Sequence, residues 1–307
     1  MIRVFIDGSA GTTGLRIRER LSARNDLELI ILPEENRKDP DARAEALNSA
    51  AVSFLCLPDA AAAEAVSFVS NPDAVIIDTS TAHRVADGWV YGMPELDGQR
   101  EKLKSAKRIA NTGCHAAGFI SLVAPLVSAG LIKKDSRLSC FSLTGYSGGG
   151  KKMIAEYESP EMDPLYQAPR QYGLGQAHKH LPEMVKYTGL DHAPVFCPIV
   201  APYYAGMEVT VPLTPAETSA TVDEIRETYR AYYRDGLIRF ANAPDENGFL
   251  SAGAFAGRDD LEVSVFGNRE RILLVSRFDN LGKGASGAAI QNMNIALGLN
   301  ETTGLVL

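Results

Sequence analysis

The sequence has few cysteines, and none of them are close together. The four, Cys56, Cys114, Cys140 and Cys197, include no CxxC pair, so neither a zinc site nor a disulfide framework is indicated. Unpaired cysteines suit a reducing compartment. The first strand-like run begins at residue 2, which leaves no room for a signal peptide. No run of about 20 apolar residues could form a transmembrane helix. We therefore expect a cytoplasmic protein with no membrane partner.

The sequence also has fewer basic than acidic residues. The chain has 31 Lys and Arg against 38 Asp and Glu, a formal net charge of −7, so it lacks the basic surface typical of nucleic-acid binding. It contains no internal repeat and no low-complexity linker. The remaining composition, 45% hydrophobic and 22% charged over 307 residues, is ordinary for a globular chain of one large or two medium domains.

The first half of the chain alternates strand-like and helix-like segments. Strands are expected at 2–6, 27–32, 51–57 and 75–78, and helices at 15–23, 41–50 and 60–69. This order predicts a parallel sheet with helices on both faces. Ligands of such sheets bind beyond the carboxyl ends of the strands. The loops at 8–14, 79–84 and 111–114 are therefore expected to share one edge.

A glycine-rich turn follows the first strand and opens the first helix. Its spacing is GxxGxxG, whereas the dinucleotide-binding fingerprint is GxGxxG. Gly8 would allow the tight turn, Gly11 the approach of a pyrophosphate, and Gly14 the packing of helix against strand. The helix N-terminus would bind the phosphates. We predict cofactor contacts along the whole turn, at Gly8, Ser9, Ala10, Gly11, Thr12, Thr13 and Gly14.

The loops after the second and fourth strands carry further candidates. Glutamates at 34–35 would bind the free 2′-hydroxyl of NAD, whereas Arg37 and Lys38 would bind the 2′-phosphate of NADP. The adjacent basic pair favours NADP, although a solvated surface pair explains the same residues. Ser80 is expected to contact the cofactor. Arg84 is either a clamp for a carboxylate or phosphate of the substrate or an exposed surface arginine.

Cys114 differs from the other cysteines in its surroundings. It follows Gly113 and a strand-like run at 108–110, and it opens a helical pattern that Pro125 should bend or interrupt. At a helix N-terminus, unpaired N–H groups and the helix dipole favour a thiolate. The alternative is a buried structural cysteine, which is what we expect of the other three, because they lie in strand-like runs.

The second half of the chain has a different pattern. Strands are expected at 136–144, 195–202 and 207–213 and in a hairpin over 263–276, with helices at 221–234 and 284–297. This predicts an α+β domain with a mixed or antiparallel sheet. A glycine run at 145–150 ends in Lys151 and Lys152, which either bind the substrate's anionic groups or are solvated lysines of a flexible loop.

Two histidines lie one residue apart, at His178 and His180. No set of cysteines or carboxylates completes a metal site with them, so no metal is expected. Thiol catalysis requires an acid/base partner. We expect His180 to be that partner because Glu183, three residues later, could orient it. His178 is the second candidate and is expected to bind substrate.

Taken together, these stretches resemble the short form of the N-acetyl-γ-glutamyl-phosphate reductases, enzymes of arginine biosynthesis. The resemblance covers nearly the whole chain. Its most specific motifs are Asn111-Thr112-Gly113-Cys114 and Lys283-Gly284-Ala285-Ser286-Gly287 with Gln291-Asn292-Met293-Asn294. The more usual family motif has proline before the glycine and tyrosine after the cysteine. This chain has Thr112 and His115 there, which leaves the role of His115 open.

The resemblance implies a domain organisation, a cofactor and a reaction. A Rossmann NADP-binding domain would span residues 1–114 and a catalytic, substrate-binding domain 115–279. A C-terminal helix within 280–307 would return to the first domain, with Asn280 on the nicotinamide side. NADPH would reduce N-acetyl-L-glutamyl 5-phosphate, a small acyl phosphate, to the 5-semialdehyde through a thioester on Cys114. A homodimer or homotetramer is expected.

Two other functions remain open. One is an aspartate-semialdehyde-type dehydrogenase, which uses the same cysteine and hydride chemistry. The other is a non-catalytic NADP-binding module in which Cys114 is unreactive.

Overall fold

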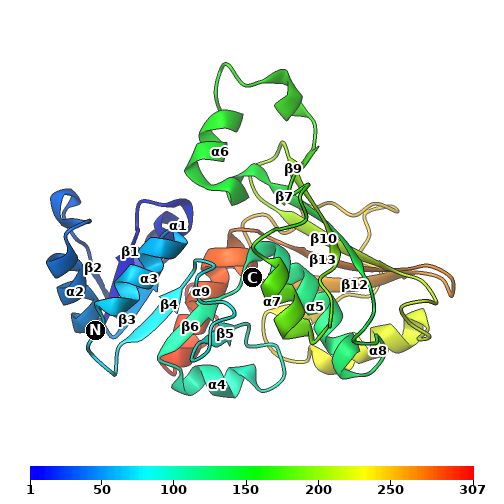
Figure 1. The fold of residues 1–307 in the computed structure, drawn as a ribbon, viewed down its shortest axis with the longest axis horizontal. Helices are drawn as coiled ribbons and strands as arrows, with labels where there is room; N and C mark the ends of the chain where they lie inside the picture. The colour runs from blue at the N-terminus through cyan, green and yellow to red at the C-terminus, as the bar shows by residue number, and fades with distance from the viewer. The chain divides into compact units, whose positions relative to one another are not determined.

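The computed structural model describes residues 1–307, which fold into two compact units (Figure 1). One unit contains residues 1–113 and 285–306, and the other contains residues 114–284 with Leu307. The chain leaves the first unit directly before Cys114 and re-enters it after Gly284.

The first unit is built on a six-stranded sheet whose paired strands are all parallel. Its strands are β1 (Ile2–Asp7), β2 (Leu27–Ile30), β3 (Val52–Leu55), β4 (Val75–Asp78), β5 (Val90–Gly92) and β6 (Arg108–Asn111), in the order β2-β1-β3-β4-β6-β5. The strand order reverses at β1, which has β2 on one side and β3 on the other. The carboxyl end of β1 is therefore the switch point where this fold binds ligands.

Helices cover both faces of this sheet. They are α1 (Thr12–Ser22), α2 (Pro40–Ser49), α3 (Asp59–Ser67), α4 (Gln99–Ser105) and α9 (Gly287–Ala296), with a 3-10 turn η1 (Glu34–Asn36). On one face, Ile17 of α1 and Ile290 of α9 share a core with the sheet. On the other, Leu47 of α2 and Ala62 of α3 form a second core. The predicted doubly covered parallel sheet is thus confirmed. The short strand β5 was not predicted, because three residues are too few for a periodic pattern.

The second unit contains a seven-stranded mixed sheet, as predicted. Its order is β11-β12-β13-β10-β7-β9-β8, with β7 (Ser139–Gly145), β8 (Arg170–Gln171), β9 (Val195–Ala201), β10 (Met207–Leu213), β11 (Ile238–Phe240), β12 (Leu261–Gly267) and β13 (Ile272–Phe278). The pairs β7–β9 and β11–β12 are parallel, and the other pairs are antiparallel.

Three helices of this unit pack together beside the sheet. The central one is α5 (Cys114–Ser128), which contacts β10 and β13 as well as α7 (Leu181–Thr188) and α8 (Val222–Tyr232). A further helix, α6 (Gly150–Tyr157), lies between the 3-10 turns η2 (Tyr146–Gly149) and η3 (Pro164–Gln167). Figure 1 shows this segment projecting from the strands of the sheet. None of the helices combines the length and the hydrophobicity that a membrane-spanning helix requires.

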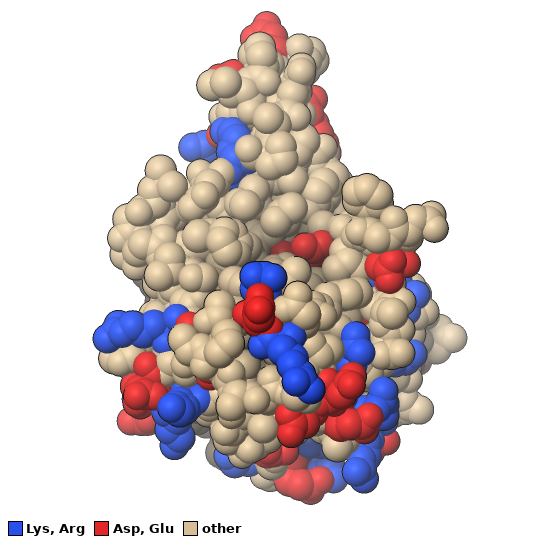
Figure 2. Space-filling view, turned by 90° about the vertical axis from the view of Figure 1, so that its right-hand side faces the viewer, with Lys and Arg blue, Asp and Glu red and all other residues tan.

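The strands β7, β9 and β13 also expose large apolar side chains. Phe141, Val195 and Leu273 are 43%, 58% and 42% exposed. Their neighbours in these strands, such as Cys140, Phe196 and Leu274, are buried, so the alternating pattern assigns the exposed set to the opposite face of the sheet. Figure 2 shows one side of the molecule on which charged side chains gather at the bottom, while the upper part is mainly uncharged.

The sequence predicts that Pro125 bends or interrupts its helix, and the structure shows that it does not interrupt α5. The helix runs through it to Ser128. Proline cannot donate to the carbonyl four residues earlier, which is that of Ser121. The Tyr233 hydroxyl donates to this carbonyl at 2.6 Å instead. A side chain that follows α8 therefore supplies the hydrogen bond that Pro125 cannot make.

Candidate active site

Cys114 is the first residue of α5 and is partly exposed. Gly284 lies against it, since a Cβ atom at that glycine would come within 2.8 Å of the Cys114 Cβ. Two other thiols have a different environment. Burial raises the pKa of Cys56 to about 12 and also raises the pKa of Cys140. These two thiols are protonated at neutral pH, whereas Cys114 has the helix-terminal position that favours a thiolate.

The histidines of the 178–180 segment lie close to the first turn of α5. The ring of His115, the residue after Cys114, is 5.6 Å from that of His178 and 5.5 Å from that of His180, measured between centroids. The His178 and His180 rings are 4.7 Å apart. The structure therefore brings the two histidines that were singled out in the sequence next to His115, the residue that follows Cys114 in α5.

The two histidines differ in their surroundings. His180 is buried, and its Nε2 is 4.0 Å from Oε1 of the buried Glu183. His178 is partly exposed, and its Nδ1 accepts a hydrogen bond from the His180 backbone N–H at 3.2 Å. The structure contains no group of three or more His, Cys, Asp or Glu side chains arranged to hold a metal ion.

His115 belongs to a hydrogen-bonded chain of three polar side chains, two of them buried, that sequence reasoning missed. Its Nδ1 is 2.7 Å from Oγ of Ser142, and its Nε2 is 2.6 Å from the hydroxyl oxygen of Tyr172. Burial, with a smaller effect of nearby His178, lowers the pKa of His115 to about 3. Ser142 and Tyr172 are 27 and 57 residues from His115 in the chain, and no motif links them.

The glycine-rich turn of the first unit has the geometry that its spacing predicts. Gly8 has a φ of +84°, and a Cβ atom there would lie 2.3 Å from the Cys56 carbonyl oxygen. A Cβ atom at Gly14 would lie 2.5 Å from the Gly8 carbonyl oxygen. Gly11 precedes α1, and its N–H donates to the Gly8 carbonyl at 2.9 Å. The turn is thus tight enough to exclude side chains at Gly8 and Gly14.

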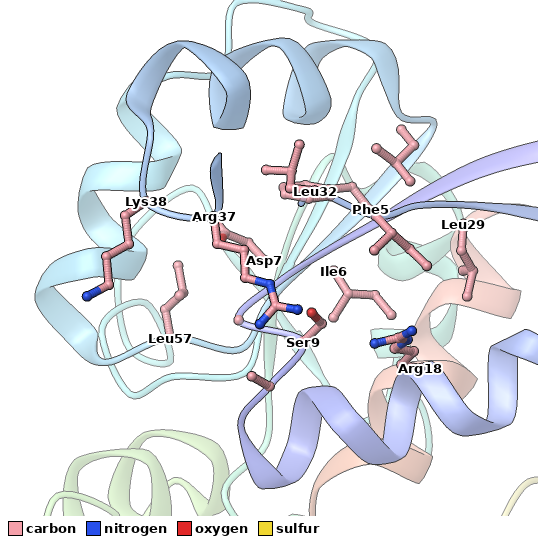
Figure 3. A pocket seen from close by; sticks show the side chains of 14 residues that line it. Phe5, Ile6, Asp7, Ser9, Arg18, Leu29, Leu32, Arg37, Lys38 and Leu57 are labelled. Atoms are coloured by element: carbon pink, nitrogen blue, oxygen red, sulfur yellow. The ribbon is translucent and has the colours of Figure 1, made fainter. Parts of the chain in front are cut away.

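A cavity of about 200 Å³ lies beside this turn. Its lining includes the turn residues Gly8, Ser9 and Ala10, the basic residues Arg18, Arg37 and Lys38, and apolar side chains of β1 and β2. Figure 3 shows the guanidinium groups of Arg18 and Arg37 on the side of Ser9, whereas the Lys38 amine points away from them. The cavity therefore combines the predicted phosphate-binding turn with the predicted 2′-phosphate residues. Arg18 was missed because it lies inside the helical pattern of α1 with no local motif.

The remaining candidates of the first unit are held by local hydrogen bonds. The Ser80 hydroxyl donates to Asp78 at 2.8 Å. Arg84 is buried rather than on the surface, and it donates Nε to the Asn111 carbonyl at 3.0 Å and Nη2 to the Thr79 carbonyl at 3.1 Å. Arg84 thus ties the loop after β4 to the end of β6.

The remaining candidates of the second unit differ in exposure. Lys151 and Lys152 are exposed at the start of α6, and Lys152 forms an ion pair of 3.9 Å with Glu156. Asn280 is buried, and its amide accepts from the Gly206 N–H at 3.0 Å and donates to Oγ of Ser147 at 2.9 Å. These contacts fix the strand ends around β7 and β10.

Comparison with known proteins gives the family. The family model described as semialdehyde dehydrogenase, dimerisation domain, matches residues 114–280. The family model described as semialdehyde dehydrogenase, NAD binding domain, matches residues 33–106. N-acetyl-gamma-glutamyl-phosphate reductase 2 of Nostoc sp. is 43% identical and is matched over 99% of both chains. The N-acetyl-gamma-glutamyl-phosphate reductase of Burkholderia ambifaria is 44% identical over 96% of both chains. The chain belongs to the N-acetyl-gamma-glutamyl-phosphate reductase family.

Solved structures of other enzymes have the same fold as this protein. Aspartate semialdehyde dehydrogenase II of Vibrio cholerae superimposes with a TM-score of 0.73 at 16% identity, over 97% of this chain and 98% of that one. Aspartate semialdehyde dehydrogenase of Candida albicans, solved with NADP, gives a TM-score of 0.70 at 16% identity over 96% of this chain and 98% of that one. The predicted family and fold class are both confirmed, and the reductase shares its fold with these dehydrogenases.

Proposed function

We propose that this protein uses NADPH to reduce N-acetyl-L-glutamyl 5-phosphate to N-acetyl-L-glutamate 5-semialdehyde and phosphate, a step of arginine biosynthesis. Relatives with this reductase name match nearly the full chain at 42–44% identity. The structural observation that carries the proposal is the position of Cys114 at the start of α5, where the next residue, His115, lies beside His178 and His180.

The chemistry begins at Cys114. Its thiolate attacks the acyl carbon, a carbon–sulfur bond forms, and the carbon–oxygen bond to phosphate breaks. When bound, NADPH would supply the hydride for reduction of the resulting thioester. The thiohemiacetal oxygen gains a proton from His180 and returns it as the carbon–sulfur bond breaks, which releases the aldehyde and regenerates the thiolate. Glu183 orients His180 for this exchange.

The binding residues follow from the same proposal. Arg37 and Lys38 bind the 2′-phosphate of NADP(H), and the turn of residues 8–14 binds its pyrophosphate. Ser80 contacts the cofactor, and Asn280 lies on its nicotinamide side. The substrate is bound by Arg84, His178, Lys151 and Lys152. The cavity beside Ser9, with two guanidinium groups in its lining, supports the cofactor part of this assignment.

Replacement of the thiol tests the proposal. Cys114→Ser should abolish NADPH oxidation with the acyl phosphate, while Cys197→Ser, a substitution in β9, should retain it. Retention of activity by Cys114→Ser within about tenfold, or ~1.4 kcal/mol of barrier, would overturn the covalent mechanism. Aspartyl phosphate assayed in parallel tests the substrate, because preference for it would favour the semialdehyde dehydrogenase alternative.

The domain bounds and the assembly form a second part of the proposal. The NADP-binding domain comprises residues 1–114 with a C-terminal helix within 280–307, and the catalytic domain comprises 115–279. The compact units support this division. The protein forms a homodimer or homotetramer, which the match to a dimerisation domain supports. Its unpaired cysteines support a cytoplasmic location.

A further inference from the structure

The hydrogen-bonded chain of Ser142, His115 and Tyr172 has no role in the mechanism above. Ser142 and His115 are both buried, with exposed fractions of 0% and 3%. Tyr172 is partly exposed and lies directly after β8, where its backbone N–H donates to the Pro198 carbonyl at 3.0 Å. The series of hydrogen bonds therefore runs from the buried Ser142 in the interior of the unit to Tyr172, which is partly accessible to solvent.

The burial of Ser142 and His115 determines which ring nitrogen of His115 carries a proton. The imidazole is neutral, so one ring nitrogen donates and the other accepts. The Ser142 hydroxyl has one hydrogen-bond partner in the structure, Nδ1 of His115. A buried hydroxyl proton without an acceptor costs about 1–3 kcal/mol, so Ser142 donates to Nδ1. The proton of His115 is then on Nε2.

This assignment fixes the direction of the second hydrogen bond. Nε2–H of His115 donates to the Tyr172 oxygen, which lies 2.6 Å away. The phenol accepts this bond and keeps its own proton for another acceptor. Burial, with a smaller contribution from nearby Cys114, raises the pKa of Tyr172. The phenol is therefore a permanent hydrogen-bond donor over the pH range in which enzymes work.

We propose that Ser142 and His115 are positioning residues that orient Tyr172 as a hydrogen-bond donor to the acyl oxygen of the substrate bound at Cys114. The proposal rests on the function proposed above. Charge develops on that oxygen when the thiolate attacks and again when hydride is transferred. A fixed donor stabilises the charge without a change in its own protonation. His115 therefore acts through Tyr172, although it is next to Cys114 in the sequence.

The direction of the two hydrogen bonds that His115 makes with Ser142 and Tyr172 can be measured without substrate. Two-dimensional NMR of protein with ¹⁵N-labelled histidine reports which ring nitrogen is protonated. The His115 signals are identified by their loss in His115→Gln. We expect the neutral Nε2–H form of His115 throughout pH 6–8. A neutral Nδ1–H form, or titration of His115 in this range, would overturn the proposal.

Kinetics test the role of the phenol. Tyr172→Phe removes one oxygen and should lower kcat for acyl-phosphate reduction at least tenfold, with KM changed less than threefold. Tyr166→Phe, in η3, is the matched control and should keep wild-type values. An unchanged kcat in Tyr172→Phe would overturn the proposal. If the wild-type protein does not reduce the acyl phosphate at all, the proposed function fails, whereas the NMR result still reports the hydrogen-bond direction.

A remote substitution separates positioning from a structural effect. Ser142→Ala removes the donor to Nδ1 and should also lower kcat, but it should have no further effect when combined with Tyr172→Phe. Independent losses that multiply in the double variant would contradict a common pathway through Tyr172. His115→Gln retains an amide near the position of Nε2 and should keep more activity than His115→Asn, whose amide lies near Nδ1. The opposite order would also overturn the proposal.

Discussion

The neutral imidazole of His115 links the protonation of the protein to its stability. Its pKa falls from 6.5 to about 3 on folding, so between these values the unfolded chain binds a proton that the folded chain does not. Stability that is fully present above pH 6.5 is therefore lost as the pH falls toward 3. We expect the free energy of unfolding to decrease by up to ~1.4 kcal/mol per pH unit through this residue.

Urea unfolding of the wild type and His115→Gln measures this effect. The slope of unfolding free energy against pH should be steeper in the wild type below pH 6, by up to about one bound proton. Between pH 7 and pH 8.5 the two proteins should differ by a constant amount, which serves as the internal control. Parallel slopes at low pH would show that His115 is protonated in the folded protein.

We expect single residues of the cavity beside the glycine-rich turn to decide the cofactor preference. Arg37 and Arg18 both line it, and their guanidinium groups lie on the side of Ser9. We expect Arg37→Ala to raise KM for NADPH about tenfold or more and to leave KM for NADH nearly unchanged, because only NADPH has the 2′-phosphate. Lys38→Ala should have a smaller effect, since its amine points away. An unchanged preference would remove Arg37 from the site.

Sequence reasoning located the residues whose position depends on local structure. Cys114 follows a strand and a glycine, and Gly8 follows a strand at a turn, so neighbouring residues define both. Ser142 and Tyr172 approach His115 only through the pairing of β7, β8 and β9. No spacing in the sequence encodes such a contact. Arg84 was placed correctly in its loop, but its burial depends on carbonyls of Asn111 and Thr79.

At the scale of elements, the strands and helices with strong periodicity were predictable and their interruptions were not. The helix expected at 221–234 is present as α8 (Val222–Tyr232), and Thr221 and Glu224 form a capping box at its start. The continuation of α5 through Pro125 depends on a tyrosine more than 100 residues later in the chain and could not be predicted. The helix that carries Cys114 is thus partly stabilised by a distant element.

This dependence is open to measurement. Tyr233→Phe leaves the Ser121 carbonyl without the donor that replaces the proline N–H. We expect a loss of about 1–3 kcal/mol of stability, the cost of a buried acceptor without a partner. Denaturant unfolding checks this, with Tyr204→Phe as a control, because Tyr204 is 45% exposed. A loss below about 0.5 kcal/mol would show that Pro125 needs no compensation.

At the scale of the whole molecule, an exposed apolar sheet face is consistent with self-association. Phe141 and Val195 lie on the same face of β7 and β9, since Phe141 pairs with Cys197 and Val195 with Ser139 in a parallel register. Together with Leu273 they expose an apolar surface of the kind that marks protein interfaces. A second copy of the same face would cover it by a two-fold arrangement.

A charge introduced on this face tests the assembly. Phe141→Lys should reduce the molar mass in solution from that of a dimer or tetramer, because an unpaired charge would be buried at the interface. Phe249→Lys is the matched control: this phenylalanine is 77% exposed but lies in the loop between β11 and β12. Light scattering coupled to size-exclusion chromatography measures the mass of each protein. If Phe141→Lys retains the wild-type mass, the interface lies elsewhere. If the wild type is itself a monomer, the exposed face has no role in self-association.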